Sequence, residues 1–260
     1  MYPKLFGFLD TYAVCMVIGI VSAFVVYLLY LKKIKVDFTT KMDLTLCLVI
    51  AVGFGIIFAI LFQNLYDLVK DPSHYHWEWS MTFIGGLAGG VGGFFLMYFL
   101  YFMKRHPNIM GKLIVIAPGC ISIAHAIGRI GCLMDGCCYG KPTDEWYGIY
   151  FETLGYKAIP TQLFEAIFLF VLSAILIFLA FKFDFFYTMP IYLFSYSIWR
   201  FLIEFIRDDD RGAFIGVFSP SQFWCFFIFA GSIILFYIFL KIKKAEETST
   251  NVQENNGPSN

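Results

Sequence analysis

The chain has 260 residues, of which 59% are hydrophobic, 20% are aromatic and only 15% are charged. This composition excludes a water-soluble globule and predicts an integral membrane protein. The 19 Lys and Arg residues balance 19 Asp and Glu residues, so the net charge gives no reason to expect a nucleic-acid partner.

Seven apolar runs in the sequence are long enough to cross about 30 Å of hydrocarbon as helices. They cover residues 12–31, 44–66, 81–103, 113–134, 162–182, 188–206 and 220–240. We therefore predict an all-α, polytopic membrane protein with about seven transmembrane helices in a membrane domain of residues 1–244. Residues 245–260 are polar and lack apolar periodicity, which predicts a disordered tail.

The basic residues of the loops predict the orientation in the membrane. The loops after the first, third, fifth and seventh runs hold 11 Lys and Arg residues, against six in the loops on the opposite side. The positive-inside rule then places the N-terminus outside and the tail in the cytoplasm. Lys32 and Lys33 follow the first apolar run instead of preceding it, so we expect a retained span and not a signal peptide.

The first and third runs each carry a feature with two interpretations. Tyr12 lies at the outer end of the first run, where an aromatic side chain is commonly an interface anchor. The third run begins MTFIGGLAGGVGG, and its Gly85 and Gly86 allow a neighbouring backbone or a lipid headgroup to approach closely. Spacing alone does not separate lipid contact from helix packing.

The fourth run ends in HAIGRIGCLMDGCCYGKPTDEWY, residues 125–147, which places polar residues and cysteines at the end of an apolar helix. A helix through this stretch carries His125, Arg129 and Cys132 on one face, and Gly136 and Gly140 then interrupt it. An arginine at such depth in a membrane is costly, so Arg129 is a candidate functional residue.

The fifth and sixth runs add a second set of buried polar residues. Pro160 is expected to start the fifth helix, with Gln162 and Glu165 buried in its first turns. The sixth run carries four polar residues within one broad helical face, Tyr196, Arg200, Glu204 and Arg207. One alternative is an Arg200–Glu204 pair that only neutralises itself.

The predicted topology brings the polar ends of the first, fourth, fifth and sixth helices to the outer side of the membrane, where they can form one pocket. Guanidinium groups bind phosphate oxygens through two parallel hydrogen bonds and stabilise charge that gathers on a phosphate leaving group. The residues alone therefore predict a phospholipid as the substrate class.

Three blocks of the sequence resemble those of the prolipoprotein diacylglyceryl transferases of bacterial inner membranes: GRIGCLMDGCCYGK, PTQLFE and YSIWRFLIEFIR. The blocks YAVCMVIG and MTFIGGLAGG match as well, so the resemblance covers most of residues 10–240. It implies transfer of a diacylglyceryl group from phosphatidylglycerol to a cysteine thiol of an exported lipoprotein precursor, at the outer face of a bacterial plasma membrane. The implied partners are this anionic phospholipid, the precursor and the bilayer, with no cofactor.

The resemblance also assigns roles to individual residues. Catalytic roles fall on Arg129, Arg200, Tyr12 and Tyr196. Substrate-binding roles fall on Gly128, Gly131, Gly136, Gly140, Glu165, Glu204 and Arg207. The same pocket makes Asp135, Gln162, Gly85 and Gly86 further substrate-binding candidates.

The chain departs from the family at several positions. Ile84 stands where the family has a histidine, and Cys132, Asp135 and Cys137 stand where it has Asn, Asn and Glu. His125 is therefore predicted to serve as the base.

The cysteines leave three further interpretations. Cys137 or Cys138 is a candidate nucleophile whose pKa Arg129 or His125 would lower. A disulfide from Cys132 to Cys137 or Cys138 is compatible with an oxidising compartment. Metal ligation by His125, Cys132 and Cys137 or Cys138 suits the ligand chemistry but matches no standard spacing, so we predict no metal site.

Two functions from different classes remain. The first is a diacylglyceryl transferase, including a divergent one with a different lipid or acceptor. The second is a non-catalytic member that binds a lipid or an exported protein. Retention of two intramembrane arginines, Arg129 and Arg200, favours the enzyme, because charge at that depth is too costly to keep without a use.

Overall fold

The structure is a computed structural model that describes residues 4–5, 9–73, 75–106, 109–208 and 219–255. The elements in chain order are β1 Lys4–Leu5, β2 Leu9–Asp10, α1 Thr11–Lys33, α2 Phe38–Lys70, α3 Phe83–Met97, the π-helical η1 Tyr98–Phe102, α4 Met103–Arg105, α5 Met110–Asp135, β3 Ile149–Phe151, β4 Tyr156–Ala158, α6 Thr161–Phe183, α7 Thr188–Ile203, the 3-10 helix η2 Glu204–Ile206 and α8 Pro220–Asn255. Within the described residues, α1, α2, α5, α6 and α8 are long and apolar enough to cross a membrane. The prediction of a helical, multi-pass membrane protein is confirmed.

Two of the seven predicted runs are helical but interrupted. In 81–103, α3 passes into the π-helical η1 and then into α4, and in 188–206, α7 tightens into the 3-10 turn η2. Neither run forms one unbroken α-helix of membrane-spanning length. The count of seven spans and the orientation of the termini therefore stay predictions.

Two local features differ from the expectation. Residues 149–158 contain an antiparallel hairpin that pairs Ile149 with Ala158, with Gly155 in the left-handed region at φ 74°. The helix α8 continues through residues 245–255, within the stretch expected to be disordered. Glu and Gln residues favour helix there, and no Gly or Pro interrupts the sequence before Gly257. Residues 256–260 lie outside the described part.

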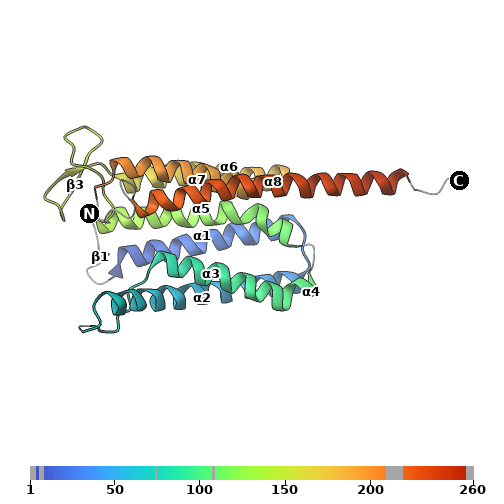
Figure 1. Ribbon diagram of the computed structural model, residues 1–260, viewed down its shortest axis with the longest axis horizontal. Coiled ribbons are helices and arrows are strands. Elements are labelled where there is room, and N and C mark those ends of the chain that lie inside the picture. Colours follow the sequence, from blue (N-terminus) through green and yellow to red (C-terminus); the bar gives the residue numbers. More distant parts are fainter. Residues whose placement is uncertain (1–3, 6–8, 74, 107–108, 209–218, 256–260) are drawn as a thin grey trace. The chain divides into compact units, whose positions relative to one another are not determined.

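The chain divides into two compact units, residues 1–30 with 111–260, and residues 31–110. In the second unit α3 packs along α2 (Figure 1). A Cβ atom at Gly85 would lie 2.6 Å from the Phe58 carbonyl oxygen, and one at Gly89 would lie 2.4 Å from the Phe58 Cβ. The glycines of α3 thus permit close helix packing, which explains this block without a ligand.

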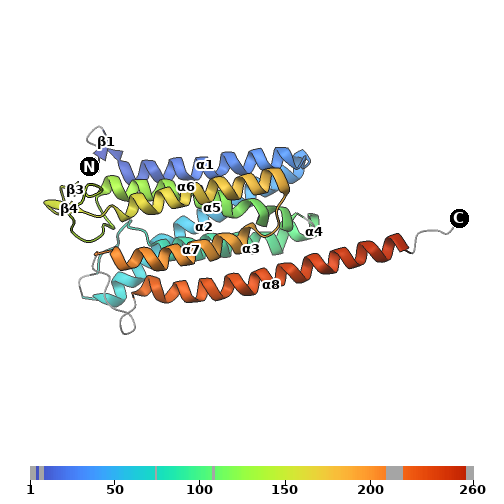
Figure 2. The same ribbon diagram turned by 90° about the horizontal axis from the view of Figure 1, so that it is seen from above.

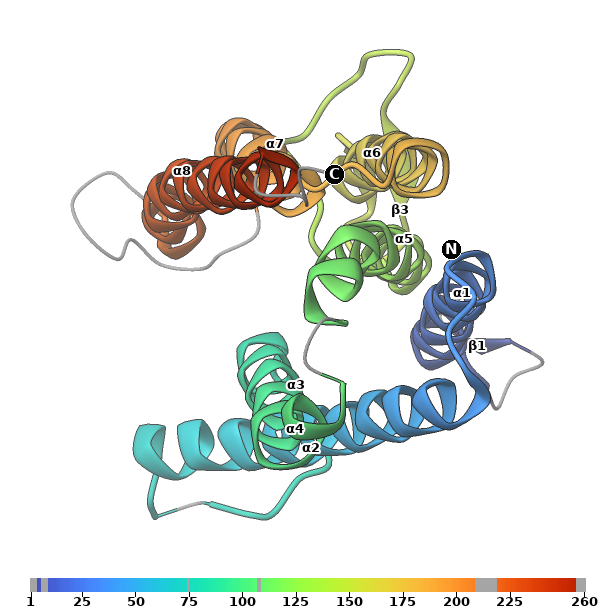
Figure 3. The same ribbon diagram turned by 90° about the vertical axis from the view of Figure 1, so that its right-hand side faces the viewer.

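In the first unit α5 is the central helix. An end-on view shows α5 between α1 and α6, with α8 beside α7 (Figure 3). The α1 contact is close, because a Cβ at Gly19 would lie 2.9 Å from the Ala124 carbonyl oxygen. Toward α6, the Ser122 hydroxyl donates to the Leu169 carbonyl at 2.9 Å, and the Ser173 hydroxyl donates to the Gly119 carbonyl at 3.0 Å.

The first turn of α7 supports an irregularity in α5. Pro118 lies inside α5 and has no N–H group, so the Ile114 carbonyl has no helical donor. The Thr188 hydroxyl lies 3.5 Å from that oxygen and donates to the neighbouring Val115 carbonyl at 2.9 Å.

The helices of this unit alternate in direction (Figure 2). Five helix ends therefore lie together: the start of α1, the end of α5, the start of α6, the end of α7 and the start of α8.

Candidate active site

The helix α5 ends in a Schellman motif that redirects the chain. Gly136 has φ 78°, its N–H donates to the Leu133 carbonyl at 3.2 Å, and the Cys137 N–H donates to the Cys132 carbonyl at 3.2 Å. Glycine suits this left-handed position because it has no Cβ to clash. The helix α5 therefore ends at Asp135, directly before the predicted break at Gly136.

The segment after this turn packs between two other segments of the chain, the one that enters α6 and the one that leaves α7. The Gly140 N–H donates to the Ile159 carbonyl at 2.8 Å, and Gly140 also pairs with Arg207 in an isolated β-bridge. A Cβ at Gly140 would lie 2.6 Å from the Ile206 carbonyl oxygen. Gly140 thus allows the end of α5, the entry to α6 and the exit of α7 to meet.

The entry of α6 holds the two cysteines that follow the turn. The Thr161 hydroxyl donates to the Cys138 carbonyl at 2.7 Å, and the Gln162 side-chain amide donates to the Cys137 carbonyl. Cys138 itself has a positive φ of 64°, which is uncommon for a residue with a side chain. The thiol sulfurs of Cys132, Cys137 and Cys138 all lie within 4.8 Å of one another.

The three thiols influence one another's protonation. Hydrogen bonds from the Cys132 and Cys137 thiols lower the pKa of the Cys138 thiol well below its ordinary range, and the positive charges of Arg207 and Arg129 act in the same direction. The pKa of Cys137 is raised, because its thiol is a donor in these hydrogen bonds and is partly buried. The hydrogen bonds within the cluster and the two arginines thus favour a thiolate at Cys138 over one at Cys137.

Glu165 forms the first of two acidic centres. It is fully buried in α6, and its carboxylate lies 3.0 Å from Arg129 Nε and 3.9 Å from His125 Nε2, both on α5. The Tyr196 hydroxyl, from α7, donates to the same carboxylate at 3.2 Å. The His125 and Tyr196 rings meet edge to face with centroids 5.3 Å apart. Three helices thus converge on one carboxylate.

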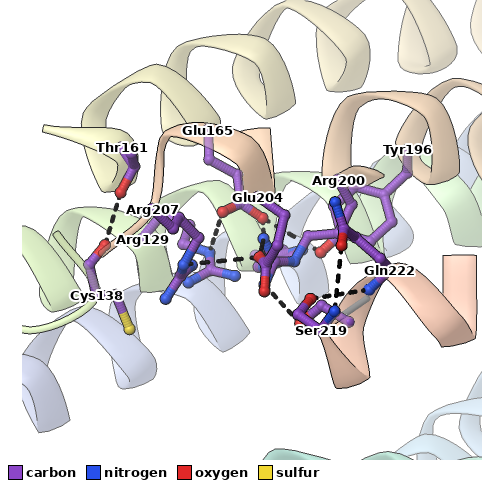
Figure 4. A network of polar contacts seen from close by, with 12 residues as sticks. Arg129, Cys138, Thr161, Glu165, Tyr196, Arg200, Glu204, Arg207, Ser219 and Gln222 are labelled. Carbon is purple, nitrogen blue, oxygen red and sulfur yellow. Dashed lines mark hydrogen bonds and ion pairs between the residues drawn. The ribbon is translucent and has the colours of Figure 1, made fainter. Parts of the chain in front are cut away.

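Glu204 forms the second acidic centre. Its carboxylate lies 2.7 Å from Arg200 Nη1 and 3.8 Å from Arg207 Nε. Arg200 Nη2 also donates to the Ser221 hydroxyl in the first turn of α8 at 2.8 Å. Figure 4 shows the two centres side by side. In the same view the Cys138 carbonyl points toward Thr161, and the Cys138 sulfur points away from it.

Arg207 does not lie on a continuous helical face, which corrects the expectation. The 3-10 turn η2 ends at Ile206, and Arg207 has an extended backbone with ψ 150°. The extended backbone lets it form the β-bridge with Gly140. Of the polar loop that follows, residues 209–218, including Arg211, lie outside the described part.

The remaining predicted residues have distinct environments. Gly131 lies against α1, since a Cβ there would lie 3.0 Å from the Cys15 Cβ and 3.1 Å from the Tyr12 ring. Gly128 also faces α1, because a Cβ there would lie 3.7 Å from the Met16 sulfur. Asp135 is exposed at the end of α5. Gly85 and Gly86 belong to the other unit, so their lipid contact stays a prediction.

The sequence did not predict that Thr161 and Ser221 contact the site. Both hydroxyls begin a helix next to the site, and a sequence signal exists for the second. Ser219 and Gln222 exchange hydrogen bonds in a capping box at 3.1 and 3.2 Å, and S-P-S-Q before an apolar run is typical of a helix start. This signal places the Ser221 hydroxyl in the first turn of α8.

The arginines of the two centres differ in the contacts that they make. Arg129 pairs with Glu165, and Arg200 and Arg207 lie near Glu204. Arg200 uses Nη1 and Nη2 on Glu204 and Ser221. For Arg129, the interactions within the described residues reach Nε and neither Nη atom. Arg129 therefore keeps both Nη groups available to bind an anion.

The chain is similar to known proteins along most of its length. A family model described as prolipoprotein diacylglyceryl transferase matches residues 5–238. Phosphatidylglycerol–prolipoprotein diacylglyceryl transferase 2 of Clostridium perfringens is 36% identical over 189 residues, which cover 70% of this chain and 71% of that protein. A phosphatidylglycerol–prolipoprotein diacylglyceryl transferase of Dehalococcoides mccartyi is 29% identical over 255 residues, 92% of each chain. One from Clostridium tetani is 29% identical over 178 residues, 66% of this chain and 67% of that protein.

Proposed function

The chain belongs to the prolipoprotein diacylglyceryl transferase family, and from this premise we propose that it transfers the diacylglyceryl group of phosphatidylglycerol to a cysteine thiol of an exported lipoprotein precursor. The acceptor thiol loses its proton, and its sulfur bonds to the glycerol carbon of the lipid. The bond from that carbon to the phosphate oxygen breaks, and glycerol phosphate leaves.

The Arg129 guanidinium, which pairs with Glu165 through Nε and with neither Nη atom among the described residues, is the observation that carries this proposal. A phosphodiester headgroup has one negative charge, and further charge gathers on the phosphate as the carbon–oxygen bond breaks. Donors that are already oriented stabilise such charge at no cost of reorganisation. Arg129 is best placed to bind the phosphate, since Glu165 orients it through Nε and its Nη atoms stay available.

His125 is the proposed proton acceptor for the thiol. Its Nε2 lies 3.9 Å from the Glu165 carboxylate, which stabilises the imidazolium that forms on proton uptake. Tyr196 positions that carboxylate with its hydroxyl. Tyr12 lines the neighbouring end of α1 against Gly131, where it can contact the lipid backbone.

The site requires a defined orientation in the membrane. We infer seven spans in a bacterial plasma membrane, with the N-terminus and the end of α5 outside and the tail cytoplasmic, because 11 basic residues fall on one side and six on the other. Cysteine-accessibility labelling should find residues 141–157 outside and residues 104–112 inside. Labelling on the reverse sides would contradict the outer location of the site.

A reconstituted assay tests the function. The purified protein in phosphatidylglycerol vesicles should convert a peptide with a lipoprotein signal and its cysteine into the thioether, with release of glycerol phosphate, both read by mass spectrometry. The same peptide with serine in place of the cysteine should remain unmodified. Vesicles of another phospholipid test for a different donor, and binding of lipid or peptide without any product would indicate a non-catalytic member.

A further inference from the structure

The thiol cluster of Cys132, Cys137 and Cys138 is a built site that the proposed transfer does not use. The structure brings the three sulfurs within 4.8 Å of one another, although Cys132 and Cys137 are five positions apart in sequence. All seven cysteines lie in the described part of the chain, and none of them forms a disulfide. The cluster is partly exposed, so an ion or a small thiol can reach it.

Two backbone features assemble the cluster. The left-handed Gly136 turns the chain back toward Cys132, and Cys138 adopts a positive φ that a residue with a Cβ rarely takes. Buried Thr161 and Gln162 hold this conformation through the carbonyls of Cys138 and Cys137. Residues held in sparsely populated backbone conformations are typical of ligand sites. The fold thus maintains an uncommon backbone conformation that keeps three sulfurs together.

The sulfur spacing suits one metal ion. Zinc binds thiolates at about 2.3 Å, and tetrahedral angles then place neighbouring sulfurs about 3.8 Å apart. The cluster needs to contract by no more than about 1 Å to reach that geometry. Soft thiolate ligands select Zn²⁺ or Cu⁺ over Mg²⁺ or Ca²⁺. Arg129 precedes Cys132 by one helical turn and interacts electrostatically with Cys132 and Cys138, which offsets the net negative charge of three thiolates around Zn²⁺.

We propose that Cys132, Cys137 and Cys138 bind one Zn²⁺ ion, with a fourth coordination position open to an external thiolate. This departs from the sequence prediction of no metal site, because the spacing of the cysteines matches no standard motif and only the folded turn brings them together. His125, the fourth ligand considered from the sequence, lies instead against Glu165 and Tyr196.

The open position gives the ion a role that rests on the proposed function. The acceptor cysteine binds Zn²⁺ as a thiolate after its proton passes to His125, and the zinc-bound sulfur then forms the carbon–sulfur bond. The carbon–oxygen bond to the phosphate breaks in the same step, and the electron pair leaves on glycerol phosphate. No oxidant or reductant is needed.

Metal binding is tested on the reduced, metal-free protein in detergent. Titration with Cd²⁺ should produce thiolate-to-metal charge-transfer absorption that saturates at one ion per chain. Cys132→Ser, Cys137→Ser and Cys138→Ser should each weaken binding at least tenfold, whereas Cys47→Ser, Cys120→Ser and Cys225→Ser should leave it unchanged. Saturation that survives the triple serine variant of the cluster would overturn the proposal.

A second measurement needs no variant and so does not depend on whether a variant folds. X-ray absorption of the zinc-loaded wild-type protein should show sulfur ligands at about 2.3 Å. A shell of oxygen and nitrogen alone would exclude the site. A disulfide between two of the three cysteines in protein purified without added oxidant would exclude it as well.

The open position is tested with Co²⁺ in place of zinc. An acceptor peptide with its cysteine should strengthen the thiolate-to-cobalt absorption, and the serine peptide should not. If wild-type protein transfers the lipid equally well with and without zinc, the role of the ion is wrong while the transferase stands. If the peptide thiol binds cobalt but neither the metal-free nor the metal-loaded protein transfers lipid, the proposed function fails and the metal site stands.

Discussion

Glu165 and Glu204 both pair with arginine, but their partners come from different parts of the chain. Glu165 receives Arg129 and His125 from α5 and Tyr196 from α7, so its partners come from other helices. Glu204 receives Arg200 and Arg207, which are its neighbours along the chain. The first centre therefore joins three helices, and the second pairs charges within one helix end and connects that end to α8 through Ser221. Ion pairs of the same residue types thus differ in structural importance.

The largest expected effect comes from removing the charge at the first centre. Glu165→Gln leaves Arg129 buried without a counter-charge, and breaking a buried pair by removing one partner costs about 3–5 kcal/mol. We expect lower thermal stability and loss of lipid transfer together. Thermal unfolding in detergent and the vesicle assay measure the two effects. A variant with wild-type stability would show that the helices do not depend on this carboxylate.

Arg129→Ala should slow catalysis in addition to lowering stability, because it leaves Glu165 buried without its arginine. Loss of one donor to a developing anion costs about 2–4 kcal/mol of transition-state stabilisation, which slows transfer by about 30-fold to 1,000-fold. Arg129→Lys keeps the charge and removes the two-pronged geometry, so its activity should fall between alanine and wild type. Near wild-type turnover by the alanine variant would contradict phosphate binding by this residue.

An exchange of charges separates structure from function at the second centre. The double variant Arg200→Glu with Glu204→Arg keeps an ion pair at the same i, i+4 spacing, so most of the stability lost in either single variant should return. Interaction energies for such neighbours are about 0.5–3 kcal/mol in double-mutant cycles. Lipid transfer should not return, because the positive charge has moved by one helical turn. Restored transfer would mean that the pair only neutralises itself.

The smallest expected effect is at the link to α8. Ser221→Ala removes the hydroxyl that accepts from Arg200 at 2.8 Å, and hydrogen bonds between membrane helices average about 0.6 kcal/mol. A modest loss of stability is expected, with transfer lowered severalfold at most. Ser219→Ala, which removes the cap without touching Arg200, is the matched control. A larger loss in Ser221→Ala than in Glu165→Gln would reverse the ranking of the two centres.

The sequence indicated which polar residues lie within the helices, but not most of their partners. Hydropathy located the long helices α1, α2, α5, α6 and α8, and the cost of intramembrane charge made Arg129 and Arg200 candidates. Local spacing also predicted the Arg200–Glu204 pair, since i, i+4 neighbours meet on any helix. The contacts of Glu165 with Arg129 and Tyr196 depend on how three helices pack, which the sequence alone does not specify. The thiol cluster depends on the left-handed Cys138, a conformation that residue type disfavours.

The reciprocal hydroxyl–carbonyl bonds of Ser122 and Ser173 have a consequence for membrane insertion. Apolar helices such as α5 and α6 can slide past one another in lipid, because hydrocarbon contacts are similar at every height. A slip of one turn moves a side chain by about 5.4 Å, which would separate Arg129 from Glu165 and leave both charges facing hydrocarbon. The two serine bonds run in opposite directions between the helices, so together they fix the relative height. Correct alignment of the charged centre therefore depends on two neutral hydroxyl groups deeper in the helix pair.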